Sequence, residues 1–132
     1  MTRASHDDRA SIQAVLEALY AARCDGDLNR LSGLFAANGR FRIAGTGDGK
    51  PIAIAADGAD AIRGWLTVLL KSFSISRREM LSTVIEGPRA AVHWRATIHS
   101  RITGAQVVTE LMDQVEVSAG KIASYVEFFV PL

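Results

Sequence analysis

Residues 112–129 read MDQVEVSAGKIASYVEFF and are the most informative stretch of the chain. Polar and apolar residues alternate on both sides of Ala119-Gly120, which is the period of a β-strand, and the Ala-Gly pair is a turn signal. The stretch predicts an antiparallel hairpin with Asp113 opposite Val126. Because successive side chains of a strand point to opposite faces, this register decides which residues face inward.

The same two-residue period runs backward from this hairpin to Phe73, so we expect four strands from Phe73 onward. Gly87-Pro88 and Thr103-Gly104 supply the other turns. A tight turn at Thr103-Gly104 places Trp94 opposite Asp113 in the neighbouring strand. The second half of the chain is thus predicted to be an antiparallel meander.

Three segments before Phe73 carry apolar residues at helical spacing. We expect helices over about His6–Cys24, where Ser5 and Asp8 resemble a capping box, from Asp27 to Asn38-Gly39, and from Asp57 or Gly58 to Ser72. A strand pair, Arg40–Ile43 and Ile52–Ala55, separates the last two. Helices grouped ahead of hairpins predict a single α+β domain over residues 1–132, with three helices packed on a curved, mostly antiparallel sheet around an apolar pocket.

The predicted registers sort the last three strands into two rows of side chains. The row expected to meet the helices is nearly all apolar and consists of Ala90, Val92, Trp94, Ala96, Ile98, Leu111, Asp113, Val115, Val117, Ile122, Val126, Phe128 and Val130. The other row mixes charges with aromatic residues and includes His93, Arg95, Glu110, Met112, Tyr125, Glu127 and Phe129. We expect this second row to face water or a second subunit, and a homodimer through it.

Asp113 is the main candidate for chemistry, because an unpaired carboxylate among apolar side chains either finds hydrogen-bond donors or takes up a proton. One interpretation is a pocket acid that donates a hydrogen bond or shuttles a proton, with Tyr20 as its partner. The other is a structural carboxylate satisfied by the Trp94 indole, by Tyr20 or by a backbone amide at a bulge. Both interpretations stay open at this point.

Large apolar residues near Asp113 are candidates for the wall of the pocket, although such residues are also ordinary core. The predicted ligand-binding set is Trp94, Trp65, Phe35, Phe41, Leu111, Val126 and Phe128.

Composition narrows the class of protein. The 132 residues carry 15 basic and 14 acidic side chains and a net charge of +1, so we expect no nucleic-acid partner. No apolar stretch approaches the length of a membrane helix and the first residues do not resemble a secretory signal, which predicts a soluble, cytoplasmic protein without a membrane partner.

No motif for a metal or cofactor emerges, and we expect neither. Cys24 is the single cysteine, and His93 and His99 are too far apart along one strand to share a metal. The segment GTGDGKP lacks the spacing of a phosphate-binding loop, because Ala44 stands where its first glycine is required.

Four segments, GDLNRLSGLF, GADAIRGWL, AAVHWRATI and MDQVEVSAGKIASYVEFF, resemble the nuclear transport factor 2-like superfamily, and within it the SnoaL-like and ketosteroid isomerase-related proteins. The resemblance implies a cone-shaped fold with a deep pocket between helices and concave sheet, often in a dimer.

In ketosteroid isomerase a sheet aspartic acid donates a hydrogen bond to the developing oxyanion, and Asp113 matches that position. The position of its general base falls at about Ile43, which has no carboxylate, and its helix tyrosine aligns nearest Leu19, one place before Tyr20. Limonene epoxide hydrolase needs Arg and Asp two apart on a strand, whereas Arg95 is followed by Thr97. The SnoaL-like polyketide cyclases use a pocket aspartate, a role that Asp113 alone can fill.

Two functional hypotheses follow. The first is a cofactor-independent isomerase, cyclase or lyase that acts by acid-base catalysis on a small apolar carbonyl compound, with Asp113 as acid and Tyr20 as partner. The second is a non-catalytic protein that binds a small apolar ligand or serves as a dimeric accessory domain.

Overall fold

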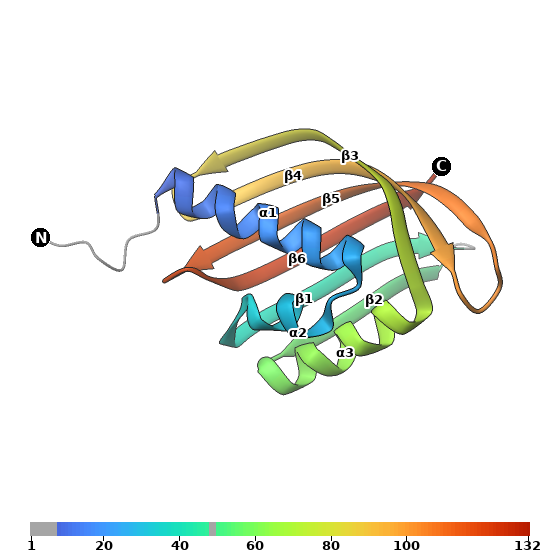
Figure 1. Cartoon of the computed structure of the whole chain (residues 1–132), viewed down its shortest axis with the longest axis horizontal. Coiled ribbons are helices and arrows are strands. Elements are labelled where there is room, and N and C mark those ends of the chain that lie inside the picture. The colour runs from blue at the N-terminus through green and yellow to red at the C-terminus, as the bar shows by residue number, and fades with distance from the viewer. Residues whose placement is uncertain (1–7, 48–49) are drawn as a thin grey trace, which may run out of the picture.

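The computed structural model describes residues 8–47 and 50–132. Two helices come first, followed by a strand pair, a third helix and four consecutive strands (Figure 1). The elements are α1 (Arg9–Asp25), α2 (Leu28–Gly33), β1 (Phe35–Gly47), β2 (Lys50–Asp57), α3 (Ala59–Ser72), β3 (Phe73–Glu86), β4 (Arg89–Ser100), β5 (Gln106–Ser118) and β6 (Lys121–Pro131). Ser5 and His6, predicted at the start of the first helix, lie outside the described residues.

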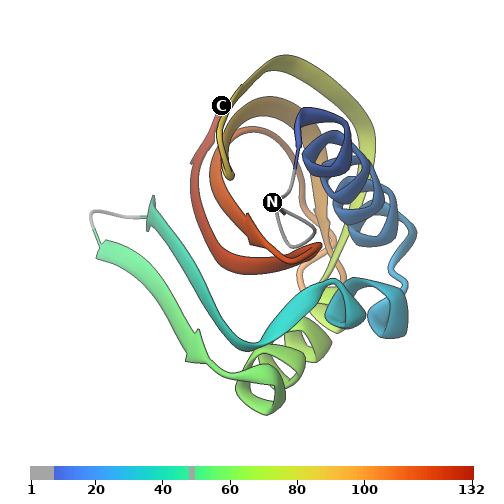
Figure 2. The ribbon, with the colours of Figure 1, turned by 90° about the vertical axis from the view of Figure 1, so that its left-hand side faces the viewer.

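The strands form one mixed sheet in the order β2-β1-β6-β5-β4-β3. Neighbouring strands are antiparallel except for β1 and β6, which run parallel. The sheet curls strongly without closing, since β2 and β3 are its two edges, and α1 lies against its concave side (Figure 2). The predicted α+β fold, with three helices on a curved sheet, is confirmed as an open roll.

The first two helices are defined by their caps. The Asp8 carboxylate accepts a hydrogen bond of 2.8 Å from the Ser11 amide at the start of α1, and Gly26 ends the helix with a left-handed backbone (φ 72°). Asp27 then caps α2 by accepting a hydrogen bond of 3.2 Å from the Arg30 amide. Asp27 is the cap that the sequence predicts, whereas Asp8, predicted inside the first helix as the acidic member of a capping box begun by Ser5, is itself the cap of α1.

Helix α2 is shorter than predicted. It ends at Gly33, so the prediction that it continues to Asn38-Gly39 is wrong, and those residues belong to β1. The Leu34 carbonyl accepts a hydrogen bond of 2.8 Å from the Ile122 amide, and a Cβ on Gly39 would lie 3.3 Å from the Ile122 carbonyl. Backbone contacts with β6 thus outweigh the local helical pattern.

The turn between β4 and β5 is longer than the predicted tight turn at Thr103-Gly104, and the register differs by two residues. Trp94 lies opposite Leu111, and Val92 lies opposite Asp113. A shift of two residues returns every side chain to the same face, because the period of a strand is two. The inward row predicted for β4 and β5 is therefore correct although its cross-strand partners are not.

The last strand departs from the prediction in a way that changes its faces. Val117 pairs with Ile122 as predicted, but Glu116 then pairs with Ser124, which leaves Ala123 as an extra residue in a β-bulge. Beyond the bulge Asp113 lies opposite Glu127 instead of Val126. A one-residue slip moves a whole strand to the opposite face.

The bulge turns Tyr125 and Glu127 into the core, where they are 1% exposed, and turns Val126 and Phe128 outward. Phe128 is 50% exposed on the convex face. The prediction that Val126 and Phe128 line the pocket is therefore wrong, and so is the prediction that Tyr125 and Glu127 face water or a partner.

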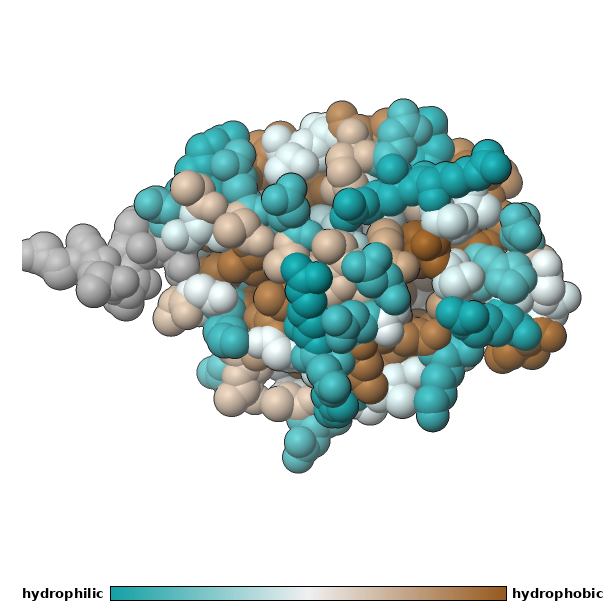
Figure 3. All heavy atoms as spheres, in the orientation of Figure 1, coloured by the Kyte–Doolittle hydropathy of each residue, from teal (hydrophilic) through white to brown (hydrophobic). Residues whose placement is uncertain are grey.

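The core lies between the helices and the concave face of the sheet, with Trp94 fully buried near its centre. Hydrophilic and apolar side chains are intermixed over the face of the molecule that carries the helices (Figure 3). Within the part of the chain that the structure describes, none of the helices has both the length and the apolar character needed to cross a bilayer.

The turn before β6 yields a first prediction. Ala119 has a left-handed backbone with φ 51°, which costs an alanine roughly 1 kcal/mol. We expect Ala119→Gly to leave stability unchanged or raise it by up to about 1 kcal/mol in urea denaturation, since glycine relieves that strain. The same substitution at Ala14, exposed in the middle of α1, serves as the control and should lose about 1 kcal/mol. Equal losses at both positions would contradict the assigned turn.

Candidate functional site

Two carboxylic acids are buried side by side on the concave face of the sheet. Asp113 of β5 is 0% exposed, Glu127 of β6 is 1% exposed, and the two residues are paired across the strands. Tyr20 and Arg23 reach them from α1, where a spacing of three places both side chains on one helical face. Burial of this many ionisable groups demands that each be hydrogen-bonded or neutralised.

Asp113 is held by three side chains that meet at one of its oxygens. Its Oδ2 accepts hydrogen bonds from Tyr20 Oη at 2.6 Å and Trp94 Nε1 at 2.9 Å, and Tyr125 Oη lies 2.8 Å away. Its other oxygen, Oδ1, is buried without a hydrogen-bond partner among the described residues. The indole and the Tyr20 hydroxyl are the two side-chain contacts that the structural interpretation of Asp113 predicted.

Glu127 forms a bidentate ion pair with Arg23. Arg23 Nη2 donates to Oε1 at 2.8 Å, and Nη1 donates both to Oε2 and, at 2.6 Å, to Tyr125 Oη. The guanidinium carbon also lies 5.4 Å from the centre of the Trp94 ring, in cation–π geometry. Arg23 is thus fixed by charge, by hydrogen bonds and by an aromatic face.

Tyr125 joins the two carboxyl groups. Its Oη lies 2.8 Å from Asp113 Oδ2 and 2.7 Å from Glu127 Oε2. Phe41 stacks on its ring at a centroid distance of 5.6 Å, and Phe35 meets it edge-on at 6.2 Å. These two phenylalanines, predicted to bind a ligand, therefore hold Tyr125 in place.

The charges in this cluster are unequal. Burial, together with the nearby charge of Glu127, raises the pKa of Asp113 well above its usual range. Burial alone would also raise the pKa of Glu127, but the Arg23 guanidinium outweighs it and holds that pKa below its usual range. Of the two carboxyl groups, Asp113 is therefore the one that holds a proton more readily, and Glu127 is the one that stays ionised opposite Arg23.

A cavity of about 380 Å³ lies in front of this cluster, between α3 and the concave face of the sheet. Among the described residues that line it, only Arg23 and Glu127 are charged. The others are mostly apolar, namely Ile43, Ile54, Leu69, Leu70, Phe73, Ile75, Ile98, Ser100, Ala105, Val107, Thr109, Leu111, Phe129 and Pro131. The Arg23–Glu127 ion pair therefore supplies the charged groups of a cavity whose wall is otherwise mostly apolar.

The predicted site residues lie in several different places. Asp113, Tyr20 and Trp94 come together as predicted, but they stand behind Tyr125 and do not line the large cavity. Leu111 does line it, whereas Phe35 and Phe41 border a separate void of about 20 Å³. Trp65 is 39% exposed, so its predicted place in the pocket is wrong, since α3 buries Ile62 and Leu66 instead.

Sequence reasoning missed Arg23, Tyr125 and Glu127. The bulge at Ala123, which turns two of them inward, has no glycine or proline to announce it. Arg23 offered one usable signal, because it follows Tyr20 by three residues on the same helix. In the described ranges, 8–47 and 50–132, three or more His, Cys, Asp or Glu side chains nowhere gather as a metal site would require.

The model of the SnoaL-like domain family matches residues 16–125, which is most of the chain. The chain belongs to the SnoaL-like domain family. A search of curated proteins finds no match to this SnoaL-like chain.

Solved structures share the fold at low sequence identity. A candidate isomerase from Bacillus subtilis is 17% identical, with a TM-score of 0.79 over 92% of this SnoaL-like chain and 87% of that one. A nuclear transport factor 2-like protein from Burkholderia xenovorans is 22% identical, with a TM-score of 0.77 over 93% and 92%. An epoxide hydrolase of the limonene epoxide hydrolase type from M. tuberculosis is 12% identical, with a TM-score of 0.71 over 92% and 84%. These likenesses establish the fold.

The unequal charges predict unequal effects of two isosteric substitutions. Glu127→Gln should lower the free energy of unfolding by roughly 3 kcal/mol or more, because it leaves the Arg23 cation buried without an anion. Asp113→Asn should cost only about 1–2 kcal/mol, since burial favours the protonated form of Asp113 and asparagine keeps the shape of a neutral carboxyl group. Urea denaturation at neutral pH measures both.

The control is Glu79→Gln, which removes an exposed carboxylate paired with Arg95 and should change stability by about 0.5 kcal/mol or less.

The pH dependence of the stability adds a second check on Asp113. Because the pKa of Asp113 is raised in the folded state, its contribution is fully present below the usual aspartate pKa and is lost as the pH rises toward the raised value. The stability gap between wild type and Asp113→Asn should therefore narrow as the pH rises, and a gap that widens would contradict a neutral Asp113.

Proposed function

We propose that this chain binds a small, mainly apolar carbonyl compound in the 380 Å³ cavity and moves a proton on it without a cofactor, as an isomerase does. The observation that carries the proposal is the Arg23–Glu127 ion pair at the wall of a chamber that is otherwise almost entirely apolar. Ligand sites commonly combine an apolar lining with a few convergent polar groups.

Arg23 is the group best placed to orient the ligand. Of its five N–H groups, three serve Glu127 and Tyr125, whereas Nε and the second hydrogen of Nη2 make no hydrogen bond within the described part of the chain. Its side chain is 16% exposed, compared with 2% for Glu127. A carbonyl oxygen that accepts from these donors would fix the ligand at the charged end of the cavity.

Glu127 then acts as the base. Its carboxylate takes the proton from the carbon next to the carbonyl, the C–H electrons move into the adjacent C–C bond, and the carbonyl π electrons move onto the oxygen that Arg23 holds. Return of the proton from Glu127 to a different carbon of an unsaturated ligand shifts the double bond. In this scheme Asp113 and Tyr20 act behind Glu127 and do not touch the ligand.

The structural relatives support this proposal at the level of fold. One of them is described as a candidate isomerase and another as an epoxide hydrolase, so this framework carries small-molecule chemistry elsewhere. Arg95 argues against the epoxide hydrolase arrangement here, because it lies in the network with Glu79 and Glu110 and not beside the cavity. Fold likeness alone does not transfer an activity.

One observation favours the second hypothesis, a protein that binds without catalysis. Both oxygens of Glu127 are engaged by Arg23, and a carboxylate held in this way is a weak base. The two candidates make different predictions for proton exchange on a bound ligand, which is what the experiment measures.

The test uses the fluorescent aryl ketone prodan to detect binding, and solvent deuterium uptake by cyclohexenone and acetophenone, followed by NMR, to detect proton transfer. Wild type should bind prodan and accelerate deuterium uptake. Glu127→Asp, which keeps the anion for Arg23, should retain binding and lose about 100-fold in exchange rate because its carboxylate is withdrawn from the ligand.

Glu79→Gln is the matched control and should retain both properties, since Glu79 lies outside the cavity. Binding without exchange, in every protein and with every ketone, would reject proton transfer in favour of the binding hypothesis. No binding by the wild type would reject both.

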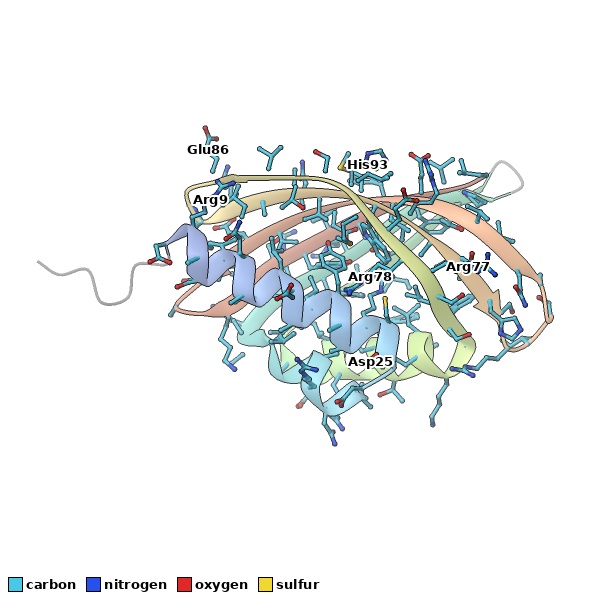
Figure 4. The ribbon with its side chains drawn as sticks, turned by 45° about the horizontal axis from the view of Figure 1, so that its top comes forward. Arg9, Asp25, Arg77, Arg78, Glu86 and His93 are labelled. Atoms are coloured by element: carbon cyan, nitrogen blue, oxygen red, sulfur yellow. The ribbon has the colours of Figure 1, made fainter. Side chains whose placement is uncertain are left out.

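We also propose that the convex face of the sheet binds a second copy of the chain. Several apolar side chains are exposed there, and they are Val84, Val108, Met112, Phe128 and Val130, at 60%, 46%, 42%, 50% and 56%. Charges of both signs border them, including Arg95 between Glu79 and Glu110, so the face is able to complement itself across a two-fold axis. His93, bonded to Glu110 at 2.7 Å, stands on this side, away from the helices (Figure 4).

Sedimentation equilibrium tests the dimer. Wild type should have twice the mass of one chain, and Phe128→Asp should have the mass of one chain, because it places a charge in the apolar patch. Trp65→Asp changes an aromatic residue of similar exposure on α3 and should leave the dimer intact. A monomeric wild type, or a dimer that survives Phe128→Asp, would reject this interface.

A further inference from the structure

If Asp113 and Glu127 were both ionised, Tyr125 would lack the hydrogen atoms needed to form a hydrogen bond with each of them. Tyr125 Oη makes a contact of 2.8 Å with Asp113 Oδ2 and another of 2.7 Å with Glu127 Oε2. Its hydroxyl carries one hydrogen, which serves one of these contacts at a time. Arg23 Nη1 approaches the same oxygen as a donor at 2.6 Å, so it cannot supply the missing hydrogen to Asp113.

A second hydrogen must therefore lie on a carboxyl group, or one of the contacts brings two lone pairs together. With that hydrogen on Asp113 Oδ2, every contact is satisfied: Tyr20 and Trp94 donate to Oδ2, Oδ2 donates to Tyr125, and Tyr125 donates to Glu127. The same placement leaves Oδ1 as a neutral carbonyl oxygen, which costs less to bury without a donor than a charged carboxylate oxygen does. Charge balance agrees as well, because Arg23 compensates only one carboxylate.

We propose that Asp113, Tyr125 and Glu127 form a proton relay, in which one proton rests on Asp113 and passes to Glu127 through the Tyr125 hydroxyl. The bonds balance. The Oδ2–H bond of Asp113 breaks as a new O–H bond forms on Tyr125, and the original Tyr125 O–H bond breaks as one forms on Glu127 Oε2. Tyr125 ends neutral, Asp113 ends ionised, Glu127 ends neutral, and the charge of the cluster is unchanged.

The surroundings make both positions of the proton accessible. When Asp113 is ionised, Tyr20 of α1 and Trp94 of β4 stabilise its oxygen as donors at 2.6 and 2.9 Å. When Glu127 is ionised, Arg23 of α1 stabilises it. Tyr20, Arg23, Tyr125 and Glu127 are the titratable groups that contact or face Asp113, and burial raises the pKa of both tyrosines, which keeps them as donors.

The relay gives the wall of the cavity two chemical states. Glu127 is a base while the proton rests on Asp113, and it becomes an acid when the relay has delivered that proton. The existence of the shared proton depends on no ligand, whereas its use on a ligand rests on the proposed function. Asp113 and Tyr125 are in this sense positioning residues for Glu127.

Infrared spectroscopy of the ligand-free protein tests the relay, with aspartate carrying a 13C label in its carboxyl group. Wild type at neutral pH should show one protonated carboxyl band, shifted by the label and absent in Asp113→Asn. If instead no protonated band is found, or if the band does not shift with the label, the resting place of the proton is wrong. Since no ligand is present, this result is independent of whether the proposed function fails.

Deuterium exchange of that band tests the route. In the wild type the Asp113 proton should exchange through Tyr125 and Glu127 to the cavity, and Tyr125→Phe, which removes the bridging oxygen, should slow this exchange by roughly tenfold or more relative to the wild type. Tyr20→Phe is the matched control, because it removes another hydroxyl from the same Asp113 oxygen without interrupting the route. Equal slowing in both variants, or in neither, would overturn the relay and leave Asp113 as an isolated neutral acid.

Discussion

A buried guanidinium needs an anion, and this constraint governs the interior of the protein. Arg23 leaves the last turn of α1 and enters the concave side of the sheet, where Glu127 neutralises it and the Trp94 ring covers it. The cost of taking both charges out of water is offset only when geometry and hydrogen bonds are good, as the two-pronged contact provides. With that pair complete, a second carboxylate at Asp113 has no counter-charge left, and its pKa is raised.

Much of the fold could be predicted from the sequence. Its strongest signals either act between residues close in sequence or still identify the inward face when the register is wrong by two residues. The predicted cap at Asp27, for example, is a short-range hydrogen bond with the Arg30 amide, three residues further on. The alternation in β4 and β5 identified the inward face correctly even though the cross-strand partners were two residues off, since an even shift preserves the faces. Asp113, read as an acid among apolar neighbours, is buried for the same reason.

The remainder depends on contacts between distant segments. The β-bulge at Ala123 shifts the register by one residue and so exchanges the two faces of the last strand. Val126 and Phe128, which the alternation places inward, face outward, and Tyr125 and Glu127 face inward. Nothing local marks that position. Similarly, the rotation of α3 that exposes Trp65 and buries Ile62 and Leu66 is set by packing. The pairing of Phe35 and Arg40 with β6 outweighs a helical pattern. Glu127, the carboxylate at the wall of the cavity, was therefore hidden from sequence patterns, whereas Asp113 was visible in them.

The parallel contact of β1 with β6 joins the early part of the chain to its final strand. Both strands that pair with β6, namely β1 and β5, are translated before it, and until β6 joins the sheet β1 pairs only with β2. Pairings between such distant segments carry a large loop-closure entropy and form slowly. The anion for Arg23 lies on that same strand, so the ion pair at the wall of the cavity forms only when β6 has joined the sheet, in the same step that pairs β6 with β1.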